Sequence, residues 1–226
     1  MENFDREDKL MKLEKLTQVI TPYVFQKKRN IMLSYYVEVE QQFNEILRTI
    51  PLENDDSVFS PKLYNILQNS CVQVENMLRL LCDRFELHYE KRKFPEYFRL
   101  LNNILEVQSI TLIKKQGGFH PFHIVDNSES PFWWIHYNKS KHELPEGFMQ
   151  GNLINTIYAL GASYVLHCMA YYAQNASKHF LDIKRWDNLP VQFTGDGELV
   201  KYPYPPLPKS DVFHYSSRYV EGAEIG

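Results

Sequence analysis

The string FWWIHYNKSKH, which ends at His142, holds the side chains of this sequence that are best suited to chemistry. On a helix, Asn138 and His142 lie four residues apart and share one face. Tyr137 and Lys141 have the same spacing. An imidazole moves protons near neutral pH, an amide can orient a phosphate, and the ammonium groups of Lys139 and Lys141 can stabilise phosphoryl charge. These are the parts of a metal-independent RNA-cleaving site.

The same residue types also suit an ordinary helix end. His142, Lys139 and Lys141 would face the negative end of the helix dipole, where positive charge is stabilising. From spacing alone, this structural interpretation is favoured over a catalytic one. A functional interpretation therefore depends on further features of the sequence.

One such feature is a resemblance. The pattern Trp-Trp-x-x-Tyr-Asn-x-x-Lys-His, just before a long uncharged segment, resembles HEPN-type domains and related uncharacterised prokaryotic proteins. It covers residues 58–180, and its specific part is 133–142. The resemblance implies a helical bundle that forms a homodimer. It also implies a relation to metal-independent endoribonucleases of toxin–antitoxin and phage-defence systems, in which an Arg-x(4–6)-His motif lies at the dimer interface.

The match to the family motif is incomplete. Asn138 and His142 take the places of the family asparagine and histidine, but Tyr137 stands where the family has arginine. Tyrosine cannot supply the fixed positive charge of a guanidinium, which Lys139 or Lys141 would replace only in part. The resemblance therefore implies a non-catalytic module that binds RNA, a nucleotide or a protein. The alternative is an endoribonuclease with His142 as general acid and base, Asn138 holding the phosphate and Lys141 assisting.

An acidic or polar residue on an earlier helix often faces the motif in such domains. Glu75 is the candidate here, because it borders the apolar stripe of the helix expected after residue 60. With Lys139 and Tyr137 it completes the predicted substrate-binding set. The alternative is a solvated Glu75 that pairs with Arg79, four residues further on.

No metal or cofactor site is expected. His120 and His123 are three residues apart, but Pro121 makes this stretch a loop, and Asp126 alone among possible ligands follows closely. The sequence also lacks the glycine-rich motifs that bind nucleotide phosphates.

The elements that must position these residues are predicted to be helices, so the fold class is all-α, an up-down bundle. Ser60-Pro61 and Ser130-Pro131 each supply a helix-capping serine and a first-turn proline. Apolar spacing and proline stops predict helices at about 10–20 (ended by Pro22), 34–50, 61–87, 95–112, 131–142 and 148–179. Residues 115–130 are expected to form a loop.

The character of the sequence changes after Ile183. Gly195-Asp196-Gly197 predicts a turn between two short extended runs, and the proline-rich stretch Tyr202–Pro208 must be extended. We therefore expect a helical bundle over residues 1–182 and an extended, β-like tail rich in Pro and Tyr over 183–226. Strand is expected only in this tail, which either packs on the bundle or binds another chain.

Composition limits the partners. Lys and Arg number 25 and Asp and Glu 28, for a net charge of −3, so an RNA partner needs a local basic patch. Basic runs at 27–29, 91–93 and 114–115 would form one with Lys139 and Lys141 if the fold gathered them. The aromatic area of Trp133, Trp134 and Tyr137 suggests the homodimer interface.

The remaining features suggest a cytoplasmic protein. Cys71, Cys82 and Cys168 are predicted to be buried free thiols of a reducing compartment, and the acidic N-terminus carries no secretory signal. Residues 147–177 contain no Asp, Glu, Lys or Arg, a length that could cross a bilayer. Their many amide side chains favour a core helix instead, and no membrane partner is expected.

Overall fold

A computed structural model of the chain describes residues 20–50, 58–105, 107–114, 117–125, 128–141, 145–175 and 214–216. This described part is mainly helical, as predicted. Its elements are the helices α2 (Pro22–Leu47), α3 (Pro61–Arg84), α4 (Phe94–Leu105), α5 (Phe132–Ser140) and α6 (Leu153–Asn175), and the short 3-10 helices η1 (Val107–Ser109) and η2 (Glu146–Gln150). Of the helix predicted near 10–20, residues 10–19 lie outside the described residues, and of the tail predicted at 183–226, residues 183–213 and 217–226 do.

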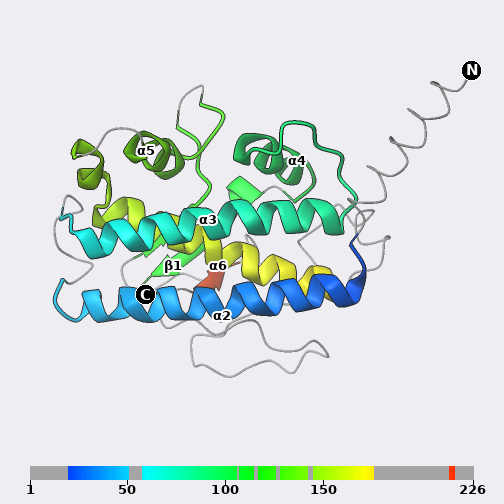
Figure 1. The fold of residues 1–226 in the computed structure, drawn as a ribbon, viewed down its shortest axis with the longest axis horizontal. Coiled ribbons are helices and arrows are strands. Elements are labelled where there is room, and N and C mark those ends of the chain that lie inside the picture. The colour runs from blue at the N-terminus through cyan, green and yellow to red at the C-terminus, as the bar shows by residue number, and fades with distance from the viewer. Residues whose placement is uncertain are drawn as a thin grey trace, which may run out of the picture.

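The long helices α2, α3 and α6 enclose most of the core (Figure 1). At one end, the Thr156 hydroxyl of α6 donates to the Leu63 carbonyl of α3, and at the other, Arg84 donates to the Ala173 carbonyl, so α3 and α6 run parallel. The Arg84 guanidinium also lies over the ring of Phe25, near the start of α2, so α2 runs antiparallel to both. Figure 1 shows α4 and α5 on one side of α3 and α2 on the other.

The start of α3 is the one that Ser60-Pro61 predicts. Pro61 is the first helical residue, and the Ser60 hydroxyl accepts a hydrogen bond from the Leu63 amide at 3.1 Å. The helix ends at Arg84, three residues before the predicted end, and Glu86 then takes a positive φ of 58°. The apolar spacing of this segment faces the core throughout.

The prediction for α2 was wrong at its start. The helix begins at Pro22, twelve residues before the expected Ser34, because Thr21 caps it by accepting from the Val24 amide at 3.3 Å. A proline has no amide hydrogen and a fixed φ, so it can open a helix as readily as it ends one. The extra turns bring Phe25 and Arg29 into the core.

The boundaries of the last two helices also differ. Although α5 follows Ser130-Pro131 as expected, Pro131 occupies the N-cap position and no side chain caps the helix. The helix α6 begins at Leu153 rather than near 148, and the Asn152 side chain accepts from the Asn155 amide at 2.9 Å in the manner of an N-cap. The residues before α6, Glu146–Gln150, form η2, which packs against both α5 and α3.

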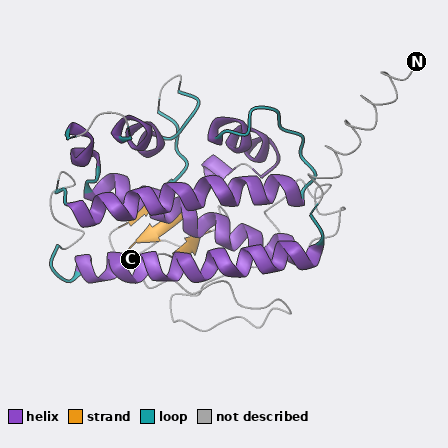
Figure 2. Ribbon diagram, in the orientation of Figure 1, coloured by secondary structure: helices purple, strands orange, loops and turns teal. Residues whose placement is uncertain are grey.

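A small antiparallel sheet corrects the strand prediction (Figure 2). Strands β1 (Thr111–Lys114), β2 (Gly117–Phe119) and β3 (His214–Ser216) are ordered β2-β1-β3. Leu112, expected in a helix, lies in β1 opposite Phe119, and both side chains pack against Gly161 of α6. The predicted loop at 115–130 thus contains a strand, and strand is not confined to the tail. Residues 214–216 of that tail pair with β1 of the same chain.

Most of the uncharged segment 147–177 forms α6, the central helix of this fold. Residues Leu153–Tyr171 of α6 are long and apolar enough to cross a membrane, but 89% of them are buried inside the protein. The three cysteines are buried free thiols, as predicted. Burial raises the pKa of Cys71 and Cys82 and that of Cys168 to about 12, which keeps these thiols protonated and unreactive.

His167, on α6, should make stability depend on pH. It is fully enclosed, and burial, helped by the charge of Arg29, lowers its pKa from 6.5 to about 3. Below pH 6.5 the unfolded chain binds a proton that the folded chain does not, so acid favours unfolding until pH 3. We expect this group to lower the free energy of unfolding by up to about 1.4 kcal/mol per pH unit in that window.

Urea unfolding of wild type and His167→Gln at pH 7, 6 and 5 checks this. The variant should lose less stability than wild type over the same range. Equal losses in the two proteins would rule out His167 as the cause.

Candidate functional site

The buried side of α5 is aromatic. Trp133, Trp134 and Tyr137 are at most 5% exposed, and the ring of Trp134 stacks on that of Phe94 at 3.9 Å. The Trp133 indole N–H donates to the Pro121 carbonyl at 2.6 Å. The suggested dimer interface on these three residues was therefore wrong, because the bundle itself covers them. The homodimer stays a prediction without that support.

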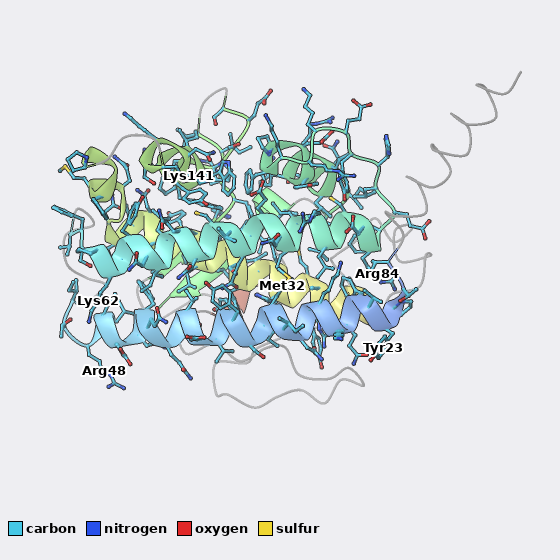
Figure 3. All side chains as sticks on the ribbon, in the orientation of Figure 1. Tyr23, Met32, Arg48, Lys62, Arg84 and Lys141 are labelled. Atoms are coloured by element: carbon cyan, nitrogen blue, oxygen red, sulfur yellow. The ribbon has the colours of Figure 1, made fainter. Side chains whose placement is uncertain are left out.

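Three of the predicted site residues lie together at the C-terminal end of α5. The Lys141 ammonium lies 3.9 Å from the centre of the Tyr137 ring and 5.7 Å from that of Trp134. It also donates to the Asn138 side-chain oxygen at 3.4 Å. Figure 3 labels Lys141 at this end of the helix, on the opposite side of α3 from α2. The lysine thus covers the Tyr137 ring.

The Tyr137 hydroxyl resists ionisation in this setting. Burial, followed by the nearby Cys71 and Glu75, raises the pKa of its hydroxyl well above 10. The phenol is therefore neutral at physiological pH and cannot hold a phosphate by charge. Its role in the structure is to support the Lys141 cation on its ring face.

Glu75 lies on α3 beneath the motif. Its carboxylate accepts a hydrogen bond from the Phe94 amide, at the start of α4, at 3.2 Å. Its charge contributes to raising the pKa of both Cys71 and Tyr137, which places it near the buried side of α5. The predicted pairing partner, Arg79, donates instead to Asn76 at 3.0 Å.

The exposure of the motif residues differs along the end of α5. Lys139 is exposed and Asn138 is half-buried. His142 follows directly on Lys141 and lies outside the described residues.

The basic runs do not form one patch. Residues 27–29 lie on α2, which Figure 1 shows on the far side of α3 from α5, and Arg29 is buried. Lys91, Arg92 and Lys93 are exposed just before α4. Lys115 of the third run lies outside the described residues, so the positive charge that the structure describes at the end of α5 is that of Lys139 and Lys141.

An apolar element lies next to these lysines. In η2, Gly147 packs on the backbone of Ser140, where an added Cβ would lie 2.6 Å from the carbonyl oxygen. The next residue, Phe148, sets its ring 4.8 Å from that of Tyr64, whose hydroxyl donates to the same Ser140 carbonyl at 3.3 Å. Phe148 is nevertheless 40% exposed and Met149 57% exposed.

The C-terminal end of α5 and the adjoining η2 together present what we call the motif-end surface. It consists of Asn138, Lys139 and Lys141 from α5 and of Phe148 and Met149 from η2. Sequence patterns do not point to Phe148 and Met149, because only the fold of the connection brings η2 back onto α5. Their position just after the helix-breaking Pro145 is the signal that could have suggested exposure.

His136 is a further polar residue of α5 that the sequence patterns did not single out. Its Nδ1 atom lies 3.0 Å from the side-chain oxygen of Asn155, whose amide nitrogen donates to the Gln150 carbonyl at 2.9 Å. The second bond orients the Asn155 amide, so its oxygen accepts from His136, and the hydrogen-bond pattern assigns the proton to Nδ1. An amide inside the apolar α6 was the signal that a polar partner faces it.

The described residues contain no cluster that could hold a metal ion by three or more His, Cys, Asp or Glu side chains. His120 contacts the Ile110 carbonyl at 3.2 Å instead. In comparisons with known proteins, no family model, curated protein or solved structure matches this chain.

Proposed function

We propose that this chain is a non-catalytic, HEPN-like module that binds single-stranded RNA through the motif-end surface. The observation that carries the proposal is an exposed aromatic ring, Phe148, on η2, which packs against the helix that presents the exposed Lys139 and Lys141. Proteins that bind single strands combine stacking rings with cations that attract the phosphates. The net charge of −3 makes such a local patch the basis of any RNA affinity.

The state of Tyr137 favours binding over cleavage. A nuclease of the resembled type needs a strong cation at this position, and Tyr137 is buried and neutral. Lys141 lies above it, but its ammonium is engaged by the Tyr137 ring and by Asn138. An ammonium held there can attract a phosphate backbone, but it lacks the planar, bidentate donors of the guanidinium that it would replace.

The alternative, a metal-independent endoribonuclease, depends on His142. In that case the wild-type protein cleaves RNA in the presence of EDTA, and His142→Ala lowers the rate by about 10²–10⁴-fold. We expect instead that structured and unstructured RNA stay intact with wild type in EDTA. Cleavage that persists in EDTA and disappears in His142→Ala would overturn the non-catalytic assignment.

The binding itself should depend on salt through the two lysines. For single strands, the logarithm of affinity falls with the logarithm of salt by about 0.7 for each neutralised phosphate. The double variant Lys139→Gln, Lys141→Gln should therefore reduce that slope by about 1.4. Fluorescence anisotropy of a dye-labelled oligouridine, measured from about 25 to 200 mM salt, gives the slope.

The matched control is the double variant Lys27→Gln, Lys28→Gln. Both lysines are exposed on α2, on the other side of α3, so the control removes the same charge elsewhere. Its slope should equal that of wild type. Equal slopes in all three proteins would contradict RNA binding at the motif-end surface, and wild type that binds no oligouridine would favour a protein partner.

A further inference from the structure

A polar layer lies inside the bundle, away from the motif-end surface. It contains side chains from all three long helices that are at most 7% exposed and carry polar atoms without a hydrogen-bond partner in the described structure. They are Arg29 of α2, Ser70 and Gln73 of α3, and His167 of α6. Arg29 Nη1 and Gln73 Nε2 are donors only, so these two atoms in particular need acceptors.

Arg29 is the charged member of this layer. Its Nε and Nη2 atoms contact the Asn30 side-chain oxygen at 3.2 and 2.7 Å, and the guanidinium lies 5.0 Å from the centre of the Tyr171 ring. The third nitrogen, Nη1, is enclosed and has no partner among the described residues. An amide and an aromatic face together leave the full positive charge uncompensated.

Burial of Arg29 in this arrangement lowers the stability of the folded protein. A guanidinium keeps its proton in proteins, so it cannot escape burial by becoming neutral as a lysine does. A buried charge without a counter-charge is strongly destabilising. Water could complete the hydrogen bonding of Nη1, but only a negative charge can compensate the guanidinium.

A second donor lies close to this charge. The ring of His167 packs 5.1 Å from that of Tyr36, and neither of its nitrogens has a hydrogen-bond partner in the described part of the chain. His167 lies one turn before Tyr171 on α6, and the Arg29 guanidinium lies over the Tyr171 ring, so the imidazole and the guanidinium are on neighbouring turns of the same helix face. In keeping with this, burial and then the charge of Arg29 lower the pKa of His167. The neutral imidazole offers one N–H to a neighbour.

Among the described residues, no carboxylate contacts the Arg29 guanidinium. Glu40, the buried acid of α2, accepts from the Tyr36 hydroxyl at 2.7 Å and lies eleven residues, about three helical turns, beyond Arg29. The next polar pair, Ser163 and Gln73, satisfies itself in part, since the serine donates to the Gln73 oxygen at 3.3 Å. Burial lowers the pKa of Arg29, and no described carboxylate acts against that shift.

We propose that Arg29 and His167 form an internal binding site for a small carboxylate or other monovalent oxyanion between α2 and α6. One anion oxygen accepts from Arg29 Nη1 and another from the N–H of His167. The ligand is small, because the side chains around it are closed to solvent. It is singly charged, because one guanidinium is the cation that faces it. The site is separate from the motif-end surface and does not depend on RNA binding.

Thermal unfolding with sodium formate as the probe tests this. Formate replaces the bulky sulfonate MES at a constant pH of about 6.5, near the ordinary pKa of histidine, and at constant ionic strength, so general salt effects cancel. Because a ligand that binds only the folded state stabilises it, the melting temperature of wild type should rise and saturate, by about 5–10 °C at a hundred-fold excess over the dissociation constant. A flat response in wild type overturns the proposal.

Variants locate the site. Arg29→Met should abolish the formate response, and in MES alone it should melt no lower than wild type, because it removes the uncompensated charge. Arg48→Met is the control: Arg48 is exposed at the end of the same helix (Figure 3), so this variant should keep the full response. A response retained by Arg29→Met overturns the proposal.

A second variant keeps the test decisive if Arg29→Met does not fold. His167→Gln retains Arg29 but changes the second donor, so the formate concentration at half-saturation should rise several-fold. An unchanged half-saturation in His167→Gln, together with an unchanged one in Arg48→Met, would show that formate acts elsewhere.

Discussion

Trp133→Ala should lower the free energy of unfolding by about 3–5 kcal/mol, the range for removing a large aromatic side chain from a core. Trp133 is fully buried, and its ring packs edge-on against those of Phe94, Phe122 and Trp134 at 5.9–6.3 Å. The substitution also removes the donor to the Pro121 carbonyl. Both effects disconnect α5 from α4 and from the loop before it.

Urea unfolding measures this loss, with the slope of free energy against urea compared between proteins. Ile135→Ala is the control on the same helix, because Ile135 is 45% exposed and should cost about 0.5 kcal/mol or less. Trp133→Phe should fall between the two, since it keeps a ring and loses the hydrogen bond. Equal costs for Trp133→Ala and Ile135→Ala would mean that α5 presents a different face to the bundle.

Local signals predicted α3 closely. Ser60-Pro61 acts within one turn, and the apolar spacing from Leu63 to Leu81 repeats along a single segment. Both signals depend only on residues that are close in the sequence, so the helix can be predicted from the sequence alone. The mainly helical class and the buried cysteines follow from the same kind of signal.

Signals that depend on distant partners were missed. Leu112 is as compatible with helix as with strand until Phe119 and Tyr215 pair with it, and Tyr215 lies about a hundred residues away. Pro22 is compatible with the end of one helix and with the start of another, because proline ends and begins helices with the same chemistry. The cap of Thr21 decides between the two, and its hydrogen bond is visible only in the structure.

In the candidate site, too, local spacing could be predicted and contacts with distant elements could not. Tyr137, Asn138 and Lys141 come together because spacings of three and four residues place side chains on one side of a helix. Whether Trp134 and Tyr137 face a partner or their own core is set by α3 and α4, which the motif does not describe. Phe148 joins the site only because Gly147 lets η2 approach Ser140 closely.

Phe148→Ala should weaken binding of a dye-labelled oligouridine by about 5–150-fold, the equivalent of the roughly 1–3 kcal/mol that stacking on one base contributes. The ring contacts Tyr64 in a tilted arrangement and is still 40% exposed, so we expect a base to stack on it without a rearrangement of η2. Phe148→Tyr keeps the ring and should bind within about twofold of wild type, since stacking tolerates changes at the ring edge.

Met149→Ala separates stacking from general apolar contact. Met149 is the more exposed of the two neighbours, so a surface that merely prefers apolar groups should lose as much affinity from this change as from Phe148→Ala. A stacking site should lose far less. Because Phe148 also contacts Tyr64, melting temperatures of all three variants must be compared with wild type, so that a weaker complex is assigned to the lost ring and not to partial unfolding. If folded Phe148→Ala binds RNA as tightly as wild type, the exposed ring of η2 is not an RNA contact, and the lysines of α5 must then act without it.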